Sequence, residues 1–166
     1  MTSYTWEFEL GAVSSITDPN GTITSSEYVD PLDRLTAVKR ATGTSDESHT
    51  AYEYDPSDIA GRTSVCTKQD IQSKGDAAAK RTCTVFDGLG REMESRLYET
   101  ATAYISTART YDGMGRPWQV SDPSRTTASA WTATTYDILN RPLDVTAPDS
   151  SKKKWVYSVS VKPNAP

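Results

Sequence analysis

The sequence predicts an all-β fold: an antiparallel sheet of repeated β-hairpins, a ribbon of about ten to twelve strands. Three observations carry this prediction. A short turn motif recurs five times along the 166 residues, its flanks alternate with the period of two typical of strands, and no stretch sustains the 3.6-residue period of a helix. The composition agrees, because Ser and Thr number 42 whereas Ile, Leu, Val and Phe together number only 25. That balance suits half-exposed strands better than a large apolar core.

The composition also excludes several classes of function. The formal net charge is −4 and no basic stripe is visible, which argues against nucleic-acid binding. No apolar run approaches the roughly 20 residues of a membrane-spanning helix. The N-terminus lacks the basic and apolar regions of a signal peptide. We nevertheless expect an extracellular or cell-surface location, in keeping with the fold class.

The first segment, residues 1–12, is predicted to be a terminal strand at one edge of the sheet. Its large apolar residues alternate with polar ones, and they are Tyr4, Trp6, Phe8 and Leu10. Such a strand either caps the sheet within one molecule or pairs with the next subunit, because an unpaired edge leaves amides and carbonyls without partners. A frayed end of a longer chain is the third interpretation.

The second segment, residues 13–148, holds the five copies of the motif. Each copy opens with an Asp that follows an aromatic residue in four copies, and closes with an Arg that follows Gly, Asn or Asp. The gaps between successive Asp residues are 25, 32, 25 and 25. The motif residues are Asp30 and Arg34; Tyr54, Asp55, Gly61 and Arg62; Phe86, Asp87, Gly90 and Arg91; Tyr111, Asp112, Gly115 and Arg116; and Tyr136, Asp137, Asn140 and Arg141.

Each motif position has a physical role in a turn. Gly, Asn and Asp are the residues that best tolerate a positive φ, so the position before the Arg marks a turn with one left-handed residue. The opening Asp can accept turn amides. The Arg is expected to lie over a neighbouring aromatic ring or to pair with an Asp carboxylate. The periodic Asp residues are therefore interpreted as structural, and we predict no metal site and no cofactor.

The two cysteines lie on consecutive predicted strands. Antiparallel pairing with an index sum near 149 would place Cys66 opposite Cys83. A cross-strand disulfide is one interpretation in an oxidising compartment, and two buried thiols are the other. The single histidine, His49, lies in a polar loop with Asp46, Glu47 and Ser48 and shows no sign of a catalytic triad. We predict no catalytic residue and no enzyme activity.

The last segment, residues 149–166, is predicted to hold the opposite edge strand and a tail. Its apolar residues alternate with Val156, Ser158 and Ser160, and they are Trp155, Tyr157, Val159 and Val161. A strand donated between subunits at either end would build a head-to-tail filament. The run Lys152–Lys154 is interpreted as solvated charge.

The recurring Tyr-Asp-x-x-Gly-Arg at about 25-residue spacing resembles the YD-repeat or RHS-repeat family. The likeness covers about Val13 to Pro148, with Phe86–Arg91 and Tyr111–Arg116 as its best copies. It implies a long antiparallel sheet of hairpins, as in bacterial RHS and insecticidal toxin-complex shells and in teneurins. Ten strands at roughly 4.8 Å give a ribbon about 50 Å wide, too narrow to wrap a passenger whose radius of gyration is about 13 Å.

We therefore expect a structural protein whose partner is itself, as a homo-oligomer or filament, or the remainder of a longer RHS-type polypeptide. The alternative is a surface module that binds a carbohydrate or a protein, because exposed Trp and Tyr rings can stack on sugars.

Overall fold

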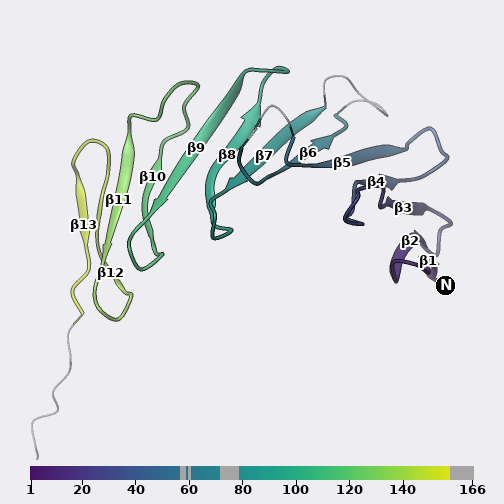
Figure 1. Cartoon of the computed structure of the whole chain (residues 1–166), viewed down its shortest axis with the longest axis horizontal. Helices are drawn as coiled ribbons and strands as arrows, with labels where there is room; N and C mark the ends of the chain where they lie inside the picture. The colour runs from purple at the N-terminus through teal and green to yellow at the C-terminus, as the bar shows by residue number, and fades with distance from the viewer. Residues whose placement is uncertain (57–58, 60, 72–78, 158–166) are drawn as a thin grey trace, which may run out of the picture. The chain divides into compact units, whose positions relative to one another are not determined.

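The computed structural model describes residues 1–56, 59, 61–71 and 79–157. Within these ranges thirteen strands follow one another in sequence order, and each strand has the preceding and following strands as its hydrogen-bonded neighbours (Figure 1). Every described strand pair is antiparallel. The predicted all-β class of repeated hairpins is therefore confirmed, with one strand more than expected.

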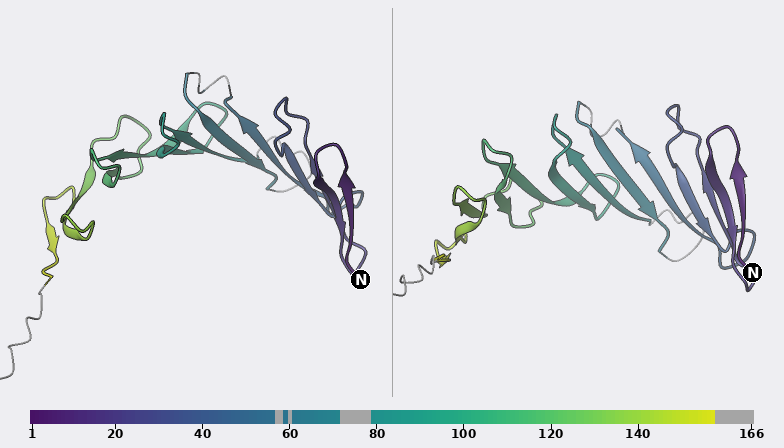
Figure 2. Two further views of the ribbon diagram at one scale, coloured as in Figure 1. Left: turned by 60° about the horizontal axis from the view of Figure 1, so that its bottom comes forward. Right: turned by 90° about the horizontal axis from the view of Figure 1, so that it is seen from below.

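The chain divides into two compact units, Met1–Ser106 and Thr107–Pro166. The strands of the first unit are β1 (Ser3–Glu7), β2 (Ala12–Thr17), β3 (Ile23–Glu27), β4 (Ala37–Arg40), β5 (Ser48–Tyr54), β6 (Ser64–Gln69), β7 (Lys80–Phe86) and β8 (Glu92–Tyr98), followed by the start of β9 (Tyr104–Tyr111). They lie side by side in one layer in every view (Figures 1 and 2).

The second unit continues the same pattern. It holds the rest of β9 and then β10 (Pro117–Ser121), β11 (Trp131–Tyr136), β12 (Pro142–Thr146) and β13 (Lys152–Lys154). Register shifts occur just beside two of its motif turns, between Pro117 and Gln119 and between Thr135 and Tyr136. A turn with one left-handed residue produces such an irregularity because it places an extra residue on one strand.

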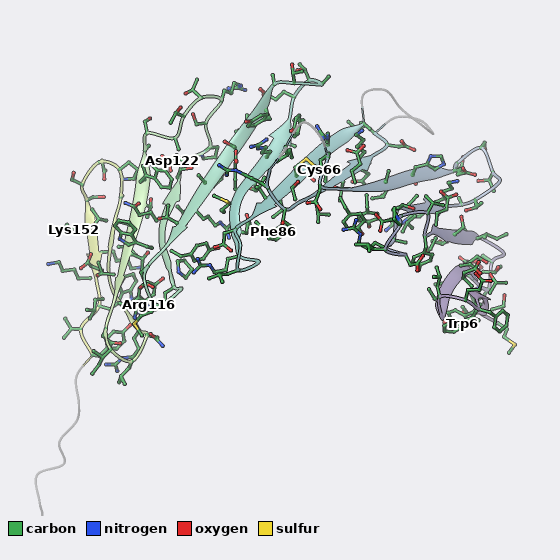
Figure 3. The ribbon with its side chains drawn as sticks, viewed as in Figure 1. Trp6, Cys66, Phe86, Arg116, Asp122 and Lys152 are labelled. Atoms are coloured by element: carbon green, nitrogen blue, oxygen red, sulfur yellow. A yellow bond between two sulfur atoms is a disulfide. The ribbon has the colours of Figure 1, made fainter. Side chains whose placement is uncertain are left out.

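The core is small and lies on β6 and β7 of the first unit. Its buried apolar residues are Ile59, Cys66, Cys83 and Val85, with Met93 and Tyr98 packed against them. Many large apolar side chains elsewhere stay exposed, such as Trp6 at 53% (Figure 3). A single layer of strands explains this, because no second layer of described residues covers either face.

Both terminal strands differ from the sequence prediction. At the N-terminus β1 ends at Glu7, and Phe8 and Leu10 lie in the turn that leads to β2. Gly11, with φ of 63°, closes that turn. At the C-terminus the edge strand is Lys152–Lys154, so Trp155 and Tyr157 follow the strand instead of forming it. Val159 and Val161 lie outside the described residues.

No helix among the described residues is long and apolar enough to cross a membrane.

Candidate functional site: the repeated Asp-Arg turn

The third, fourth and fifth motif copies form the same five-residue turn. In the third copy the Asp87 amide donates to the Arg91 carbonyl over 2.9 Å, and the Gly90 amide donates to the Asp87 carbonyl over 3.0 Å. The turns that begin at Asp112 and Asp137 repeat both bonds with lengths between 2.9 and 3.1 Å. Each turn joins two neighbouring strands, so the motif fixes where a hairpin reverses.

The Asp carboxylate holds the inside of the turn. Asp87 Oδ1 accepts the amides of Leu89 and Arg91, each over 2.9 Å, while Oδ2 accepts Arg91 Nε over 2.7 Å. The fourth and fifth copies repeat these contacts. The first copy differs in detail, because Arg34 donates two nitrogens to the two oxygens of Asp30, over 2.8 and 2.7 Å. One carboxylate thus satisfies turn amides and fixes the guanidinium at the same time.

The residue before each Arg is left-handed, as its type predicts. The φ values are 56° at Asp33, 79° at Gly61, 75° at Gly90, 80° at Gly115 and 64° at Asn140. These residue types carry the smallest penalty for a positive φ.

The second copy departs from this geometry because three more residues separate its Asp from its Arg. Asp55 Oδ1 accepts the Ser64 amide over 2.7 Å, and Arg62 Nη1 contacts Met93 Sδ over 3.5 Å. Ile59, within the longer loop, is 4% exposed and joins the small core. The longer second copy therefore contributes a core residue in place of the compact turn.

Arginine and tyrosine link one copy to the next. The Arg116 guanidinium lies 4.8 Å from the centre of the Tyr136 ring, and Nη1 donates to the Asn140 side chain over 3.0 Å. Tyr136 OH in turn donates to the Pro117 carbonyl over 2.8 Å. Arg34 and Tyr54 repeat this arrangement in the first unit, at 3.9 Å from guanidinium to ring. Both contacts predicted for the Arg therefore occur together, and Figure 3 labels Arg116 beside the other side chains.

Tyr157 makes the contacts of a motif tyrosine, which the sequence reasoning missed. Its ring lies 4.1 Å from the Arg141 guanidinium, and its hydroxyl donates to the Pro142 carbonyl over 2.9 Å. A signal was present in the sequence, because Tyr157 precedes Lys162-Pro163 by the same spacing that separates Tyr136 from Arg141-Pro142. A further pair, Arg81 over Tyr98, was also not expected.

The turns lower the pKa of their carboxyl groups. The Arg34 side chain, bonded to Asp30, lowers the pKa of Asp30 from 3.8 to about 2. In the other three compact copies the amide of the closing Arg, followed by its side chain, holds the pKa of Asp87, Asp112 and Asp137 below the ordinary value. The charged form of each carboxyl group is therefore favoured by folding.

Acid should weaken the protein through these four turns. A lowered pKa adds stability that is present above the unfolded-state value and is lost as the pH falls through the folded-state value. We expect the melting temperature to drop as the pH falls from about 4 to about 2, because each Asp must then be protonated. Circular dichroism melts across this range test the expectation. An Asp30→Asn variant, whose amide does not titrate, should show a smaller drop, and an equal drop would contradict the assignment.

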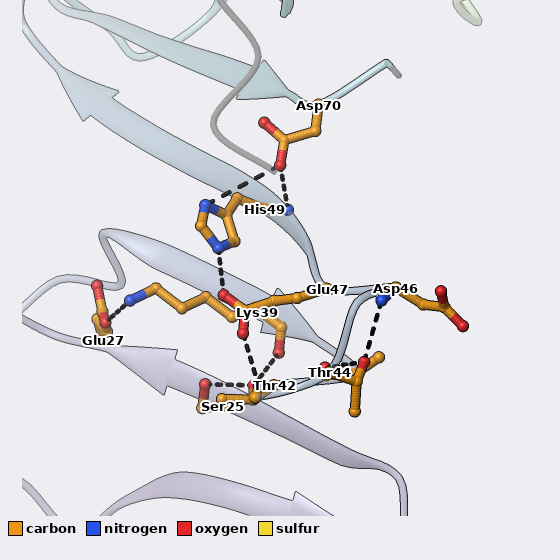
Figure 4. Close-up of polar contacts among 11 residues, drawn as sticks. Ser25, Glu27, Lys39, Thr42, Thr44, Asp46, Glu47, His49 and Asp70 are labelled. Carbon is orange, nitrogen blue, oxygen red and sulfur yellow. Dashed lines mark hydrogen bonds and ion pairs between the residues drawn. The ribbon is translucent and has the colours of Figure 1, made fainter. Parts of the chain in front are cut away.

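His49, the second residue of β5, lies between two carboxylates, and Figure 4 shows this cluster. Its Nε2 lies 2.7 Å from Glu47 Oε1, and its amide donates to Asp70 Oδ2 over 2.8 Å. Glu47 Oε2 also accepts the Gly43 amide over 2.6 Å. Close by, Lys39 pairs with Glu27 and the Ser25 and Thr42 hydroxyls bond over 2.9 Å. These contacts brace loop 41–47 against β3, β4 and β5, which is a structural role.

The cysteines meet across β6 and β7. The register pairs Cys66 with Cys83, and a disulfide of 1.99 Å joins their sulfur atoms. Cys66 is 0% and Cys83 is 2% exposed. Among the described residues no group of His, Cys, Asp and Glu is arranged to hold a metal ion. The motif side chains bind one another and the backbone, so their chemistry is that of a repeated structural joint.

A comparison with known families agrees with a repeated structural unit. Residues 9–45, which include the Asp18 turn and the whole Asp30–Arg34 copy, match the family model described as RHS Repeat. This match shows an RHS repeat in residues 9–45 of the chain. The resemblance to the RHS-repeat family that the motif predicted is thereby confirmed, and it supports a structural repeat role.

Similarity to individual proteins is distant. No curated protein matches the sequence. One solved structure that matches is the crystal structure of TcdB2-TccC3-Cdc42, with a TM-score of 0.49 and 13% sequence identity. The match covers 95% of the present chain and 10% of that chain. The present chain thus spans about a tenth of the length of this neighbour.

Proposed function

We propose that this chain is a structural segment that extends a β-sheet through its two open edge strands, without catalysis. It does so as part of a longer RHS-type polypeptide or shell, or by head-to-tail assembly of copies. The observation that supports this proposal is that β1 and β13 lie at the two ends of the strand order, each with one neighbouring strand. Every residue of both strands is exposed. An exposed strand edge is a template for another strand.

The joints support this proposal because they are modular. Each Arg–Tyr contact ties one copy to the next, so a further copy needs only a Tyr at the same place. Tyr157 already fills that place beyond the fifth copy. Tyr157 therefore makes the contact through which each copy is joined to the next, which is what an array of repeats requires.

The disulfide supports an extracellular or cell-surface location. Disulfides persist in oxidising compartments and are rare where glutathione keeps thiols reduced. The buried Cys66–Cys83 bond links neighbouring strands of the small core. We propose that the chain works outside the reducing cytosol.

Deleting residues 1–10 tests assembly through the edge strands. The deletion removes β1 and its exposed apolar side chains, so we expect head-to-tail oligomers or fibres of the full chain to disappear. Size-exclusion chromatography and electron microscopy measure this. A Tyr4→Ser, Trp6→Ser variant is the matched control, because it keeps the backbone edge and should still assemble. Unchanged fibres after the deletion would contradict donation of the N-terminal strand.

A carbohydrate- or protein-binding surface is the second candidate. The observation that favours it is that Trp6 and Trp118 are 53% and 46% exposed, on sheets that no second layer of described residues covers. A solvent-exposed indole can stack on a sugar ring or a protein side chain. A monomer that is retained on a glycan column, and released by a Trp118→Ser substitution, would favour this candidate over assembly.

A further inference from the structure

The two open edge strands carry side-chain charges of opposite sign. At one end of the strand order β13 consists of three exposed lysines, Lys152–Lys154. At the other end Glu7 is the last residue of β1 and Glu9 follows in the turn to β2, and both are exposed. Figure 3 labels Lys152 on β13 and Trp6 on β1. Each edge therefore combines an outer side that no described strand pairs with and a charge of one sign.

The acidic character of the β1 end extends beyond the strand itself. A cavity of about 350 Å³ beside β1 is lined in part by the acidic residues Glu7, Glu9, Glu27 and Asp33. Glu27 already pairs with Lys39. Among the described residues no ion pair engages Glu7, Glu9 or Asp33. The β1 edge thus offers a lysine side chain both room and carboxylates whose charge the described part of the chain does not neutralise.

The signs of the charges select which edges can meet. Two β13 strands side by side would set one lysine run against another, and two β1 strands would bring Glu7 and Glu9 of both copies together. Like charges across a contact oppose it, whereas opposite charges steer the encounter and fix the register. The charges therefore favour β13 of one copy beside β1 of the next, a contact in which each edge takes part through its own unit alone.

We propose that β13 of one copy pairs with β1 of a second copy, and that lysines of β13 bind the carboxylates of Glu7 and Glu9. This inference rests on the proposed function, because it names the partner of the same open edges. Side chains alternate along a strand, so Lys152 and Lys154 share one face of the sheet. Lys153 has the opposite face, and its Nζ lies 5.2 Å from the centre of the Trp155 ring. Lys152 and Lys154 are therefore the pair that binds the acidic edge.

Lysines on an edge strand also have a simpler role, which is to prevent pairing with other chains. The two roles are compatible, because lysines repel a basic edge and attract an acidic one, which makes pairing selective. They differ in what happens when the charge is removed. A Lys152→Ser, Lys154→Ser variant should assemble more readily if the lysines only block the edge, and more weakly if they bind Glu7 and Glu9.

Reversing the charge at each edge in turn tests the pairing. One variant carries Glu7→Lys and Glu9→Lys, so that both of its edges are basic. The other carries Lys152→Glu and Lys154→Glu, so that both of its edges are acidic. Alone, each should need a roughly tenfold higher concentration to assemble, or more, whereas an equimolar mixture should assemble like the wild type. Light scattering and electron microscopy at low salt measure this. Circular dichroism should show unchanged folding, because all four positions are exposed.

The matched control reverses two acidic residues away from the edge strands. Asp46 and Asp122 are exposed and lie in loops, so Asp46→Lys with Asp122→Lys changes the net charge as much as the β1 variant does. This control should assemble like the wild type. Wild-type assembly should also slow as the salt concentration rises from about 0.01 M to about 1 M, because the screening length falls from about 30 Å to about 3 Å.

The outcomes separate this inference from the proposed function. Assembly that persists in both reversed variants would overturn the ionic pairing and leave sheet extension through strand edges intact. Stronger assembly of the Lys152→Ser, Lys154→Ser variant would overturn it as well, since the lysines would then only block the edge. A wild type that stays monomeric would overturn both this pairing and the head-to-tail assembly of copies. If that monomer cosedimented with phosphatidylcholine–phosphatidylserine vesicles through Lys152 and Lys154, the lysines would instead bind an anionic lipid surface.

Discussion

Replacing both Cys66 and Cys83 with alanine is expected to lower the free energy of unfolding by about 3 kcal/mol. The disulfide spans 17 residues of sequence, and a loop of that size loses this much freedom in the unfolded chain. The effect is large here because the core is thin: the two cysteines are half of its four buried residues. For a chain of this length the melting temperature should fall by about 10 °C.

Thermal melts with and without reductant measure this effect and control for the substitution itself. Reduction of the wild type should reproduce the lowered melting temperature, whereas the double alanine variant should not respond to reductant. Because Cys66 and Cys83 are buried, the reductant must act while β6 and β7 are transiently open. A wild type that melts identically in both conditions would show that the disulfide does not hold the sheet together.

The turns could be predicted from the sequence because their chemistry is local. Asp at the first position and Gly, Asn or Asp at the fourth determine both the amide bonds and the left-handed φ, and no distant residue takes part. The strand register follows from the turns, which is why an index sum near 149 agreed with the observed pairing of Cys66 with Cys83. The Arg–Tyr contact was foreseen only as an alternative to the Asp pair, since sequence spacing does not exclude one contact in favour of the other.

The ends of the chain could not be predicted in the same way. Alternation of apolar residues shows which side chains share a face, but it does not show where a strand stops or whether anything covers that face. Tyr157 illustrates the limit: the alternating pattern around it suggested a strand, whereas its contacts with Arg141 and Pro142 are those of a motif tyrosine. Trp6 shares a predicted apolar face with Tyr4, yet both are more than half exposed.

Substituting Gly90 with alanine is expected to lower the free energy of unfolding by about 1–2 kcal/mol, the usual penalty for a side chain in the left-handed region. Gly90 has φ of 75°, and a Cβ added there would meet no atom within 4 Å. Steric contact is thereby excluded as a cause, so the loss isolates the backbone conformation. Chemical denaturation of the variant and the wild type measures the difference.

Gly88, two residues earlier in the same turn, is the matched control. A Cβ there would also meet no atom within 4 Å, and its φ lies outside the left-handed region. Gly88→Ala should therefore leave the stability unchanged or raise it by about 0.5 kcal/mol, because alanine restricts the unfolded chain. The fifth copy agrees with this difference between the two positions. It has the β-branched Ile138 at the Gly88 position, but Asn140, which tolerates a positive φ, at the Gly90 position. Equal effects of the two substitutions would mean that the left-handed residue is not what shapes the turn.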